Sequence, residues 1–223
     1  MINTIPLFPP IVLSKCRVPA GTSEGGQFAS CDDGWADKDW AENNFGQFGL
    51  FKPEYRDTLR SKPEYKETME TAQYLVEGLG KERALEAWKT TDKYTATTYG
   101  RLNKSLRDGK VPKNTKQIDD YVEHAPKVQK DVVYRGVDAT VWNTLKNGTT
   151  FTDKAFVSTT TDRDTAKYFS GRKKKGGILI IEGVKNKAAR VPKSRESEFL
   201  LPRNSKFQVV SLKDDEATVR LIS

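Results

Sequence analysis

The sequence predicts an α+β fold in which a layer of helices packs on a curved or doubled antiparallel sheet. Apolar residues recur at three- and four-residue steps before residue 125, as on the buried faces of helices. After residue 130, short segments rich in β-branched residues follow one another. Because the helices come first and the strands later, rather than in alternation, an α+β fold is favoured over a parallel α/β sheet.

The chain of 223 residues is long enough for one sizeable core. Residues 1–50 are rich in Gly, Pro, Ser and Asp and show no sustained periodicity, which is typical of an extension or a loosely ordered arm. We therefore expect two parts, an arm over residues 1–50 and one folded domain over residues 51–223.

Four helices are expected in order along the chain. Pro63 and Glu64 fit the first turn of a helix whose apolar stripe begins at Tyr65 and which ends near Gly78 or Gly80. The other three are expected over residues 81–89, 97–107 and 115–124.

The strands follow after residue 130, with turn residues between them. Shorter helical segments are expected near residues 141–146 and 164–169. The expected strands cover residues 131–136, 155–160, 177–182, 188–192, 196–201, 205–212 and 216–222.

The composition excludes several classes of protein. The formal net charge of +8 favours acidic partners, although the charged residues are scattered along the chain. Contact with nucleic acid is compatible with this charge but is not required by it. Cys16, Cys31 and His124 are the only cysteines and histidine, so neither a disulfide framework nor a Cys/His metal site is expected. We expect no membrane contact, because neither a signal peptide nor a membrane span is recognisable.

Polar residues follow or interrupt three of the expected apolar strands. Arg135 closes the first, Ser158 to Thr160 end the second, and Glu196 and Glu198 begin the third. In an extended strand, residues i and i+2 point to the same face, so the two carboxylates would point together as an acid/base pair. A solvated strand edge is the alternative for such a Glu-x-Glu motif.

In this order, the Arg, Ser-Thr-Thr and Glu-x-Glu motifs resemble the signature of the Arg-Ser-Glu class of mono-ADP-ribosyltransferases, of the exoenzyme toxin type. Residues 94–107 are similar to that family's helix with two tyrosines and an asparagine, and residues 131–138 to its first core strand. The resemblance covers residues 81–222 and implies a helical layer packed on two antiparallel sheets that form an NAD cleft.

The resemblance implies that Arg135 and Gly136 bind NAD. A guanidinium can hold the pyrophosphate by paired, charge-assisted hydrogen bonds, and a glycine lets backbone amides approach the carboxamide of nicotinamide. The alternatives from the residues themselves are a salt-bridged arginine and a simple bend at the end of a strand.

By the same resemblance, Glu198 stabilises the positive charge that develops on the ribose when the nicotinamide bond breaks. Ser158 orients Glu198, and Ser158 and Thr159 help to seat the nicotinamide ribose. The alternative for these hydroxyl groups is a strand face turned to solvent.

Glu196 has a separate role by resemblance. A protonated guanidinium is a poor nucleophile, so this carboxylate would orient an acceptor arginine and assist removal of its proton. In the family, glutamate at this position accompanies arginine acceptors. The preceding loop, residues 185–195, departs from the family pattern because it contains no aromatic residue.

Tyr94, Tyr99 and Asn103 are placed near the NAD phosphates by the resemblance; the alternative is a core helix with tyrosine hydroxyls at its rim. Residues 161–177 would form the phosphate–nicotinamide loop. Tyr168 or Phe169 could stack on nicotinamide there, whereas Ala166 and Phe169 fit equally well as helix-packing residues.

The implied activity is transfer of ADP-ribose from NAD to arginine side chains of target proteins, with release of nicotinamide and without a metal. Two alternatives stay open, an NAD glycohydrolase and a basic, non-catalytic binding module on the same fold. Residues 17–29 resemble a glycine-rich segment of phage head-associated proteins. We therefore expect action in the cytoplasm of a target cell, such as a bacterial host, and virion packaging as one route of delivery.

Overall fold

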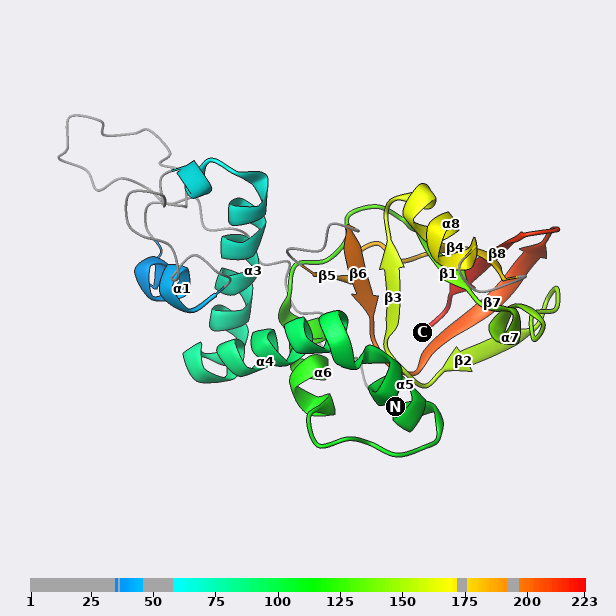
Figure 1. The fold of residues 1–223 in the computed structure, drawn as a ribbon, viewed down its shortest axis with the longest axis horizontal. Helices are drawn as coiled ribbons and strands as arrows, with labels where there is room; N and C mark the ends of the chain where they lie inside the picture. The colour runs from blue at the N-terminus through cyan, green and yellow to red at the C-terminus, as the bar shows by residue number, and fades with distance from the viewer. Residues whose placement is uncertain (1–34, 36, 46–57, 172–175, 192–196) are drawn as a thin grey trace, which may run out of the picture. The chain divides into compact units, whose positions relative to one another are not determined.

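The computed structural model describes residues 35, 37–45, 58–171, 176–191 and 197–223 (Figure 1). By their contacts the residues divide into two units, Met1–Asp39 and Trp40–Ser223. In the second unit, Ala41 and Phe45 are buried, and the Phe45 ring lies 5.2 Å from that of Trp88. Ala41 of α1 (Lys38–Asn44) and Phe45, directly after this helix, thus contribute to the core, and a division of the chain at residue 50 stays a prediction.

The helical layer begins with α3 (Pro63–Leu79), which has proline at its start and Glu64 in its first turn, as predicted. Gly80 ends it with a φ of 77°, a conformation that favours glycine. Gly78 lets α3 approach α6 (Thr115–His124), because a Cβ there would lie 2.2 Å from the ring of His124.

The second and third predicted helices form one continuous helical run. This run consists of α4 (Lys81–Lys93), a π-helical turn η3 (Tyr94–Thr98) and α5 (Tyr99–Arg107). The gap predicted at residues 90–96 is therefore wrong. Several threonines in this stretch lower helix propensity, but tertiary packing maintains the helix, and Thr91 and Tyr94 are buried.

The eight strands form one hydrogen-bonded sheet in the order β2-β7-β8-β4-β1-β3-β6-β5. All neighbours are antiparallel except β4 and β8, which are parallel. Most of the predicted strands are confirmed, whereas β2, with Phe151 as its one large apolar residue, was not predicted. The strands are β1 (Val132–Val137), β2 (Thr150–Asp153), β3 (Val157–Thr160), β4 (Gly177–Glu182), β5 (Ala189–Arg190), β6 (Glu198–Leu201), β7 (Ser205–Leu212) and β8 (Glu216–Leu221).

The sheet has two parts that meet at a seam between β1 and β3. Six residue pairs join β1 to β4 and four join β3 to β6, but a single pair, Tyr134 with Thr160, joins β1 to β3. The expected pair of sheets is thus present as five strands and three strands connected at one point. The helical layer with this sheet confirms the predicted fold class.

Two short helices follow the strands of the seam. Asp138 caps α7 (Ala139–Trp142) by accepting a hydrogen bond from the backbone amide of Val141 at 3.2 Å. Asp162 lies before α8 (Arg163–Gly171) and accepts hydrogen bonds from Asp164 N and the Thr165 hydroxyl. Figure 1 shows α8 against the end of β1, and this contact shapes the site described next.

Candidate active site

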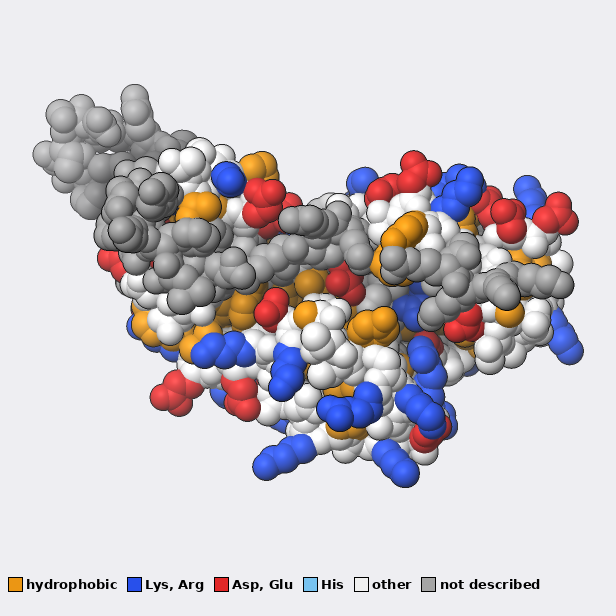
Figure 2. Space-filling model, in the orientation of Figure 1, with side chains coloured by type: hydrophobic (Ala, Val, Ile, Leu, Met, Phe, Trp, Pro, Cys, Tyr) orange, Lys and Arg blue, Asp and Glu red, His pale blue; other side chains and the backbone are white. Residues whose placement is uncertain are grey.

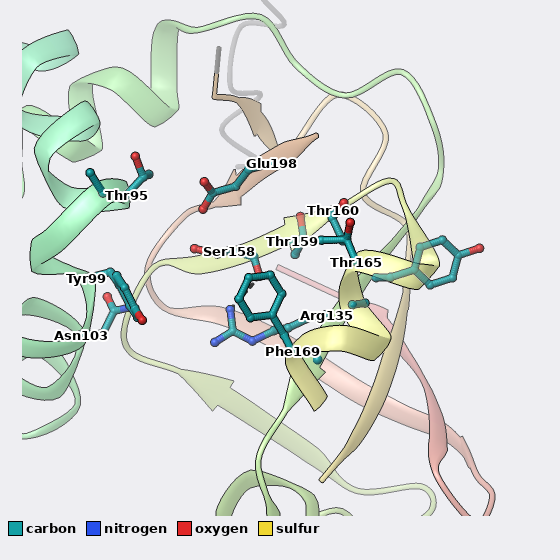
Figure 3. Close-up of a pocket in the computed structure, with 14 residues that line it drawn as sticks. Thr95, Tyr99, Asn103, Arg135, Ser158, Thr159, Thr160, Thr165, Phe169 and Glu198 are labelled. Carbon is teal, nitrogen blue, oxygen red and sulfur yellow. Dashed lines mark hydrogen bonds between the residues drawn. The ribbon is translucent and has the colours of Figure 1, made fainter. Parts of the chain in front are cut away.

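A cavity of about 340 Å³ opens at the seam of the sheet, between α5 and α8 (Figure 3). Seven of the residues predicted for the site line this one cavity, and they come from β1, β3, β6 and α5. They are Tyr99, Asn103, Arg135, Gly136, Ser158, Thr159 and Glu198.

Arg135 lies at the centre of the cavity on β1 and is half-buried. Its Nη1 donates a hydrogen bond to the backbone carbonyl oxygen of Ser158 at 2.8 Å. Burial lowers the pKa of the guanidinium from its ordinary value, because desolvation disfavours the charged form. Among the described residues, no carboxylate forms an ion pair with Arg135, so the strand-end salt bridge is not observed there.

Glu198 enters the cavity from the first position of β6, where it pairs with Thr160 of β3. Directly opposed residues of an antiparallel pair point to the same face, and so do residues two apart on one strand. Glu198, Thr160 and Ser158 therefore share one face. Figure 3 shows the carboxylate of Glu198 and the hydroxyl of Ser158 directed toward the same space as the Arg135 guanidinium.

The prediction that Glu196 and Glu198 share a strand face depends on a strand that begins at Glu196. The strand begins at Glu198, and Ser197 between the two has a φ of 47°, in the left-handed region. The alternation of an extended strand therefore does not relate the two glutamates. Glu196 itself lies outside the described residues, as do residues 192–195 of the preceding loop.

Thr159 lines the cavity, but its hydroxyl group forms a hydrogen bond within the sheet. Its Oγ1 donates to the carbonyl oxygen of Phe199 across the β3–β6 pair at 2.9 Å, and the side chain is buried. A donor engaged in this way is not available to a ribose hydroxyl. Thr159 therefore holds β3 against β6 at the level of Ser158 and Glu198.

Gly136 is required by a helix. A Cβ at this position would lie 2.2 Å from the carbonyl oxygen of Ala166 and 2.6 Å from the amide of Ser170, both on α8. Only a residue without a side chain lets α8 pack so closely on β1. This contact explains the glycine better than a simple bend, and it brings α8 to the rim of the cavity.

Tyr94 does not line the cavity. It is fully buried, and its hydroxyl donates to Asn103 Oδ1 at 3.2 Å, while Asn103 Nδ2 contacts the Phe156 carbonyl oxygen at 3.5 Å. Burial raises the pKa of Tyr94 to about 12, because desolvation disfavours the phenolate. Tyr94 therefore positions Asn103, and of the two predicted tyrosines only Tyr99 reaches the cavity.

The cavity also has lining residues for which the sequence predicted no role in the site. Thr95 and Ala96 belong to the π-helical turn, a local irregularity that is frequent at functional sites. Thr165 and Ala166 line it from α8, on the turn of helix that precedes Phe169. The three- and four-residue spacing to Phe169 is the signal that could have identified them as one helix face.

Of the two candidate aromatic residues, Phe169 lines the cavity and Tyr168 does not. Tyr168 is 56% exposed and packs edge-on against Phe169, with ring centroids 5.7 Å apart. Figure 3 shows the Phe169 ring beside Arg135.

Neither a metal site nor a membrane-spanning helix is found among the described residues. In this part of the chain, no three side chains of His, Cys, Asp or Glu are grouped to hold a metal ion. The described helices include none with the length and apolar character that crossing a membrane requires.

A family model described as ADP-ribosyltransferase exoenzyme matches residues 80–222, which is more than half of the chain. The chain belongs to this family. The matched range contains every residue that lines the cavity, and ADP-ribosyltransferases use NAD as a substrate.

Among curated proteins, this exoenzyme-family chain is similar to the NAD(+)–arginine ADP-ribosyltransferase EFV of Enterococcus faecalis (strain ATCC 700802 / V583). The two are 32% identical over 133 residues. The match covers 52% of this chain and 27% of the relative, so the chain corresponds to a minor part of that protein's length.

Solved structures of ADP-ribosyltransferase toxins share the fold. Exoenzyme S from Pseudomonas aeruginosa, solved with human 14-3-3 protein beta and bound to Carba-NAD, is 16% identical with a TM-score of 0.52, over 72% of this chain and 90% of that one. The C3 exoenzyme of Clostridium limosum is 15% identical with a TM-score of 0.54, over 73% and 96%. These identities support a common fold alone.

Proposed function

We propose that the protein transfers ADP-ribose from NAD to arginine side chains of target proteins and releases nicotinamide. The observation that carries this proposal is the meeting of Arg135 and Glu198 in one cavity at the seam of the sheet. A cation and a carboxylate that face the same space, from separate strands, suit a substrate with an anionic pyrophosphate and a glycosidic bond that breaks with positive charge.

The cavity fits part of NAD in size and polarity. Its volume of about 340 Å³ lies in the range of small-molecule sites, and its lining combines hydroxyl groups and an amide with the ring of Phe169. Arg135 keeps Nε and Nη2 free of ion pairs within the described residues, so these groups can donate to phosphate oxygens.

Cleavage of the nicotinamide bond needs negative charge beside the ribose. As the C1′–N bond breaks, positive charge develops on the ribose, and a carboxylate held nearby stabilises it. Glu198 is the carboxylate that lines the cavity. Glu198 shares one strand face with Ser158 and Thr160, and we expect the positive charge on the ribose to develop beside this face.

The acceptor completes the reaction. The acceptor guanidinium gives up a proton and its nitrogen forms a bond to C1′, while nicotinamide leaves with the electron pair of the broken bond. The arginine specificity of the Enterococcus relative and the glutamate at position 196 both support arginine as the acceptor.

We place this reaction in the cytoplasm of the target cell, which supplies both NAD and proteins. Virion packaging is one route of delivery, and mass spectrometry of purified particles tests it.

The experiment combines the purified chain with NAD labelled on its adenine part and a bacterial lysate. We expect labelled proteins, and mass spectrometry should find ADP-ribose on arginine. Glu198→Gln should reduce labelling by about a hundredfold or more, because a neutral amide does not stabilise the positive charge of the transition state. Undiminished labelling by this variant would refute the role of Glu198.

Glu196→Gln separates arginine transfer from NAD hydrolysis. If Glu196 activates the acceptor, this variant should lose transfer to protein and to agmatine, a small guanidinium acceptor, but keep release of nicotinamide to water. Equal loss of both activities would place Glu196 in NAD cleavage instead. Hydrolysis without any transfer by the unsubstituted chain would identify an NAD glycohydrolase.

A further inference from the structure

Six basic residues recur at strict three-residue steps along α5, the loop after it and the start of α6. They form a surface that we call the basic ridge: Arg101, Lys104, Arg107, Lys110, Lys113 and Lys116. All six are exposed. Figure 2 shows blue side chains gathered over α5 and over the loop that joins it to α6. The proposed chemistry uses none of them.

Half of the ridge is neutralised by carboxylates. Lys104 pairs with Asp108 at 2.7 Å, Arg107 with Asp153 at 2.8 Å and Lys116 with Asp120 at 2.8 Å. Within the described residues, the other three, Arg101, Lys110 and Lys113, have no ion pair. The ridge therefore presents three uncompensated positive charges set among ion pairs.

An exposed apolar residue lies between two of these charges. Val111 is 66% exposed, and its loop is anchored by backbone hydrogen bonds from Lys110 N to Ser105 O at 2.9 Å and from Thr115 N to Pro112 O at 3.0 Å. Gly109, with a φ of 78°, permits the turn. An exposed apolar side chain on an anchored loop, with charges around it, resembles the centre and rim of a protein interface.

The ridge begins next to the cavity. Tyr99, the first residue of α5, lines the cavity, and Arg101 follows two positions later. The nine residues of α5 span about 14 Å at the helical rise. One protein interface of ordinary size can therefore cover both the loop and the mouth of the cavity. A protein seated on the ridge can thus present a side chain to the cavity.

We propose that the basic ridge docks an acidic surface of the target protein beside its acceptor arginine. This inference rests on the proposed function. An acidic protein surface is favoured over nucleic acid for two reasons: the carboxylates of the three ion pairs would repel a continuous phosphate backbone, and Val111 offers an apolar contact that phosphates do not use.

The test compares two triple variants of equal charge change. The ridge variant is Arg101→Glu/Lys110→Glu/Lys113→Glu. The matched control is Lys66→Glu/Lys146→Glu/Lys206→Glu, three exposed lysines in α3, after α7 and in β7 that are not part of the ridge and have no ion pairs in the described part of the chain. With a purified target protein, the ridge variant should raise KM by about tenfold at low salt, whereas the control should not. Both variants should modify agmatine, which needs no docking, at the unsubstituted rate.

A binding measurement keeps the test independent of catalysis. Fluorescent poly-glutamate and a single-stranded DNA of equal charge are titrated at about 50 mM and about 200 mM salt. We expect the ridge variant to bind poly-glutamate about tenfold more weakly than the control does. Equal binding by the two variants would overturn the proposal, and tighter DNA binding that only the ridge variant loses would assign the surface to nucleic acid.

Failure of the proposed function gives a different pattern. In that case the unsubstituted chain would modify neither protein nor agmatine, while the difference in poly-glutamate binding would persist. Active agmatine modification with an unchanged KM for the target would instead reject the docking surface and leave the transferase function standing.

Discussion

Arg135 donates a hydrogen bond from Nη1 to the backbone carbonyl oxygen of Ser158 at 2.8 Å, and this bond crosses the seam between β1 and β3. The guanidinium is thereby oriented by a group that cannot titrate. Its remaining donors stay available to the cavity, which is how a single side chain can both join two strands and bind an anion.

Arg135→Lys tests this double role. Lysine keeps the charge but loses the planar set of donors, so kcat/KM for NAD should fall by about ten- to a hundredfold. Steady-state nicotinamide release measures the effect. Arg107→Lys is the control, because Arg107 keeps its charge beside Asp153 outside the cavity lining. Equal losses in both variants would contradict a specific role for Arg135.

Gly136→Ala should destabilise the domain by about 1–3 kcal/mol, because the new methyl group would collide with the backbone of α8. Gly100→Ala is the matched control on the exposed face of α5, where a Cβ meets no atom within 4 Å. This control should be stabilising by about 0.5–1 kcal/mol. Urea unfolding measures both, and an unchanged midpoint for Gly136→Ala would show that α8 can move away.

Phe169→Ala and Tyr168→Ala form a neighbouring pair that separates stacking in the cavity from surface packing. Phe169 lines the cavity and Tyr168 does not, so only Phe169→Ala should raise the KM for NAD, by about tenfold. Thermal unfolding shows whether each variant remains folded. A larger effect from Tyr168→Ala would mean that α8 turns on binding NAD.

The raised pKa of Tyr94 predicts a loss of stability at alkaline pH. Burial raises its pKa from 10.0 to about 12, so between these values the unfolded chain loses the proton while the folded chain retains it. The stabilisation is complete below pH 10 and is lost as the pH rises to 12. Buried Tyr121 also has a raised pKa, so part of the decline should persist in Tyr94→Phe.

Unfolding free energies at neutral and alkaline pH measure this effect, with tyrosinate absorbance as the direct readout. Tyr94→Phe should cost about 1 kcal/mol at neutral pH through the hydrogen bond to Asn103 and should then decline less steeply. An identical alkaline slope in both proteins would exclude Tyr94 as a contributor.

The sequence predicted the fold class because the helical periodicity precedes the strand pattern, and it singled out cavity residues such as Arg135 and Ser158 because they are polar residues within apolar strands. It could not predict the π-helical turn at Tyr94–Thr98, because that turn depends on packing against distant residues such as Phe156. It also began a strand at Glu196, whereas the strand begins at Glu198, because no pattern in Glu-Ser-Glu signals a left-handed Ser197. Gly136 illustrates a third limit, since the helix that requires it begins more than twenty residues later.

The seam has a consequence for the mechanics of the molecule. Because β1 and β3 pair only through Tyr134 and Thr160, most of the backbone groups on their facing edges do not hydrogen-bond to the other strand. The cavity occupies that opening and has walls on both parts. A substrate bound there would contact both parts of the sheet and hold them together. The two parts should therefore move least relative to each other while substrate is bound, and more once the products leave.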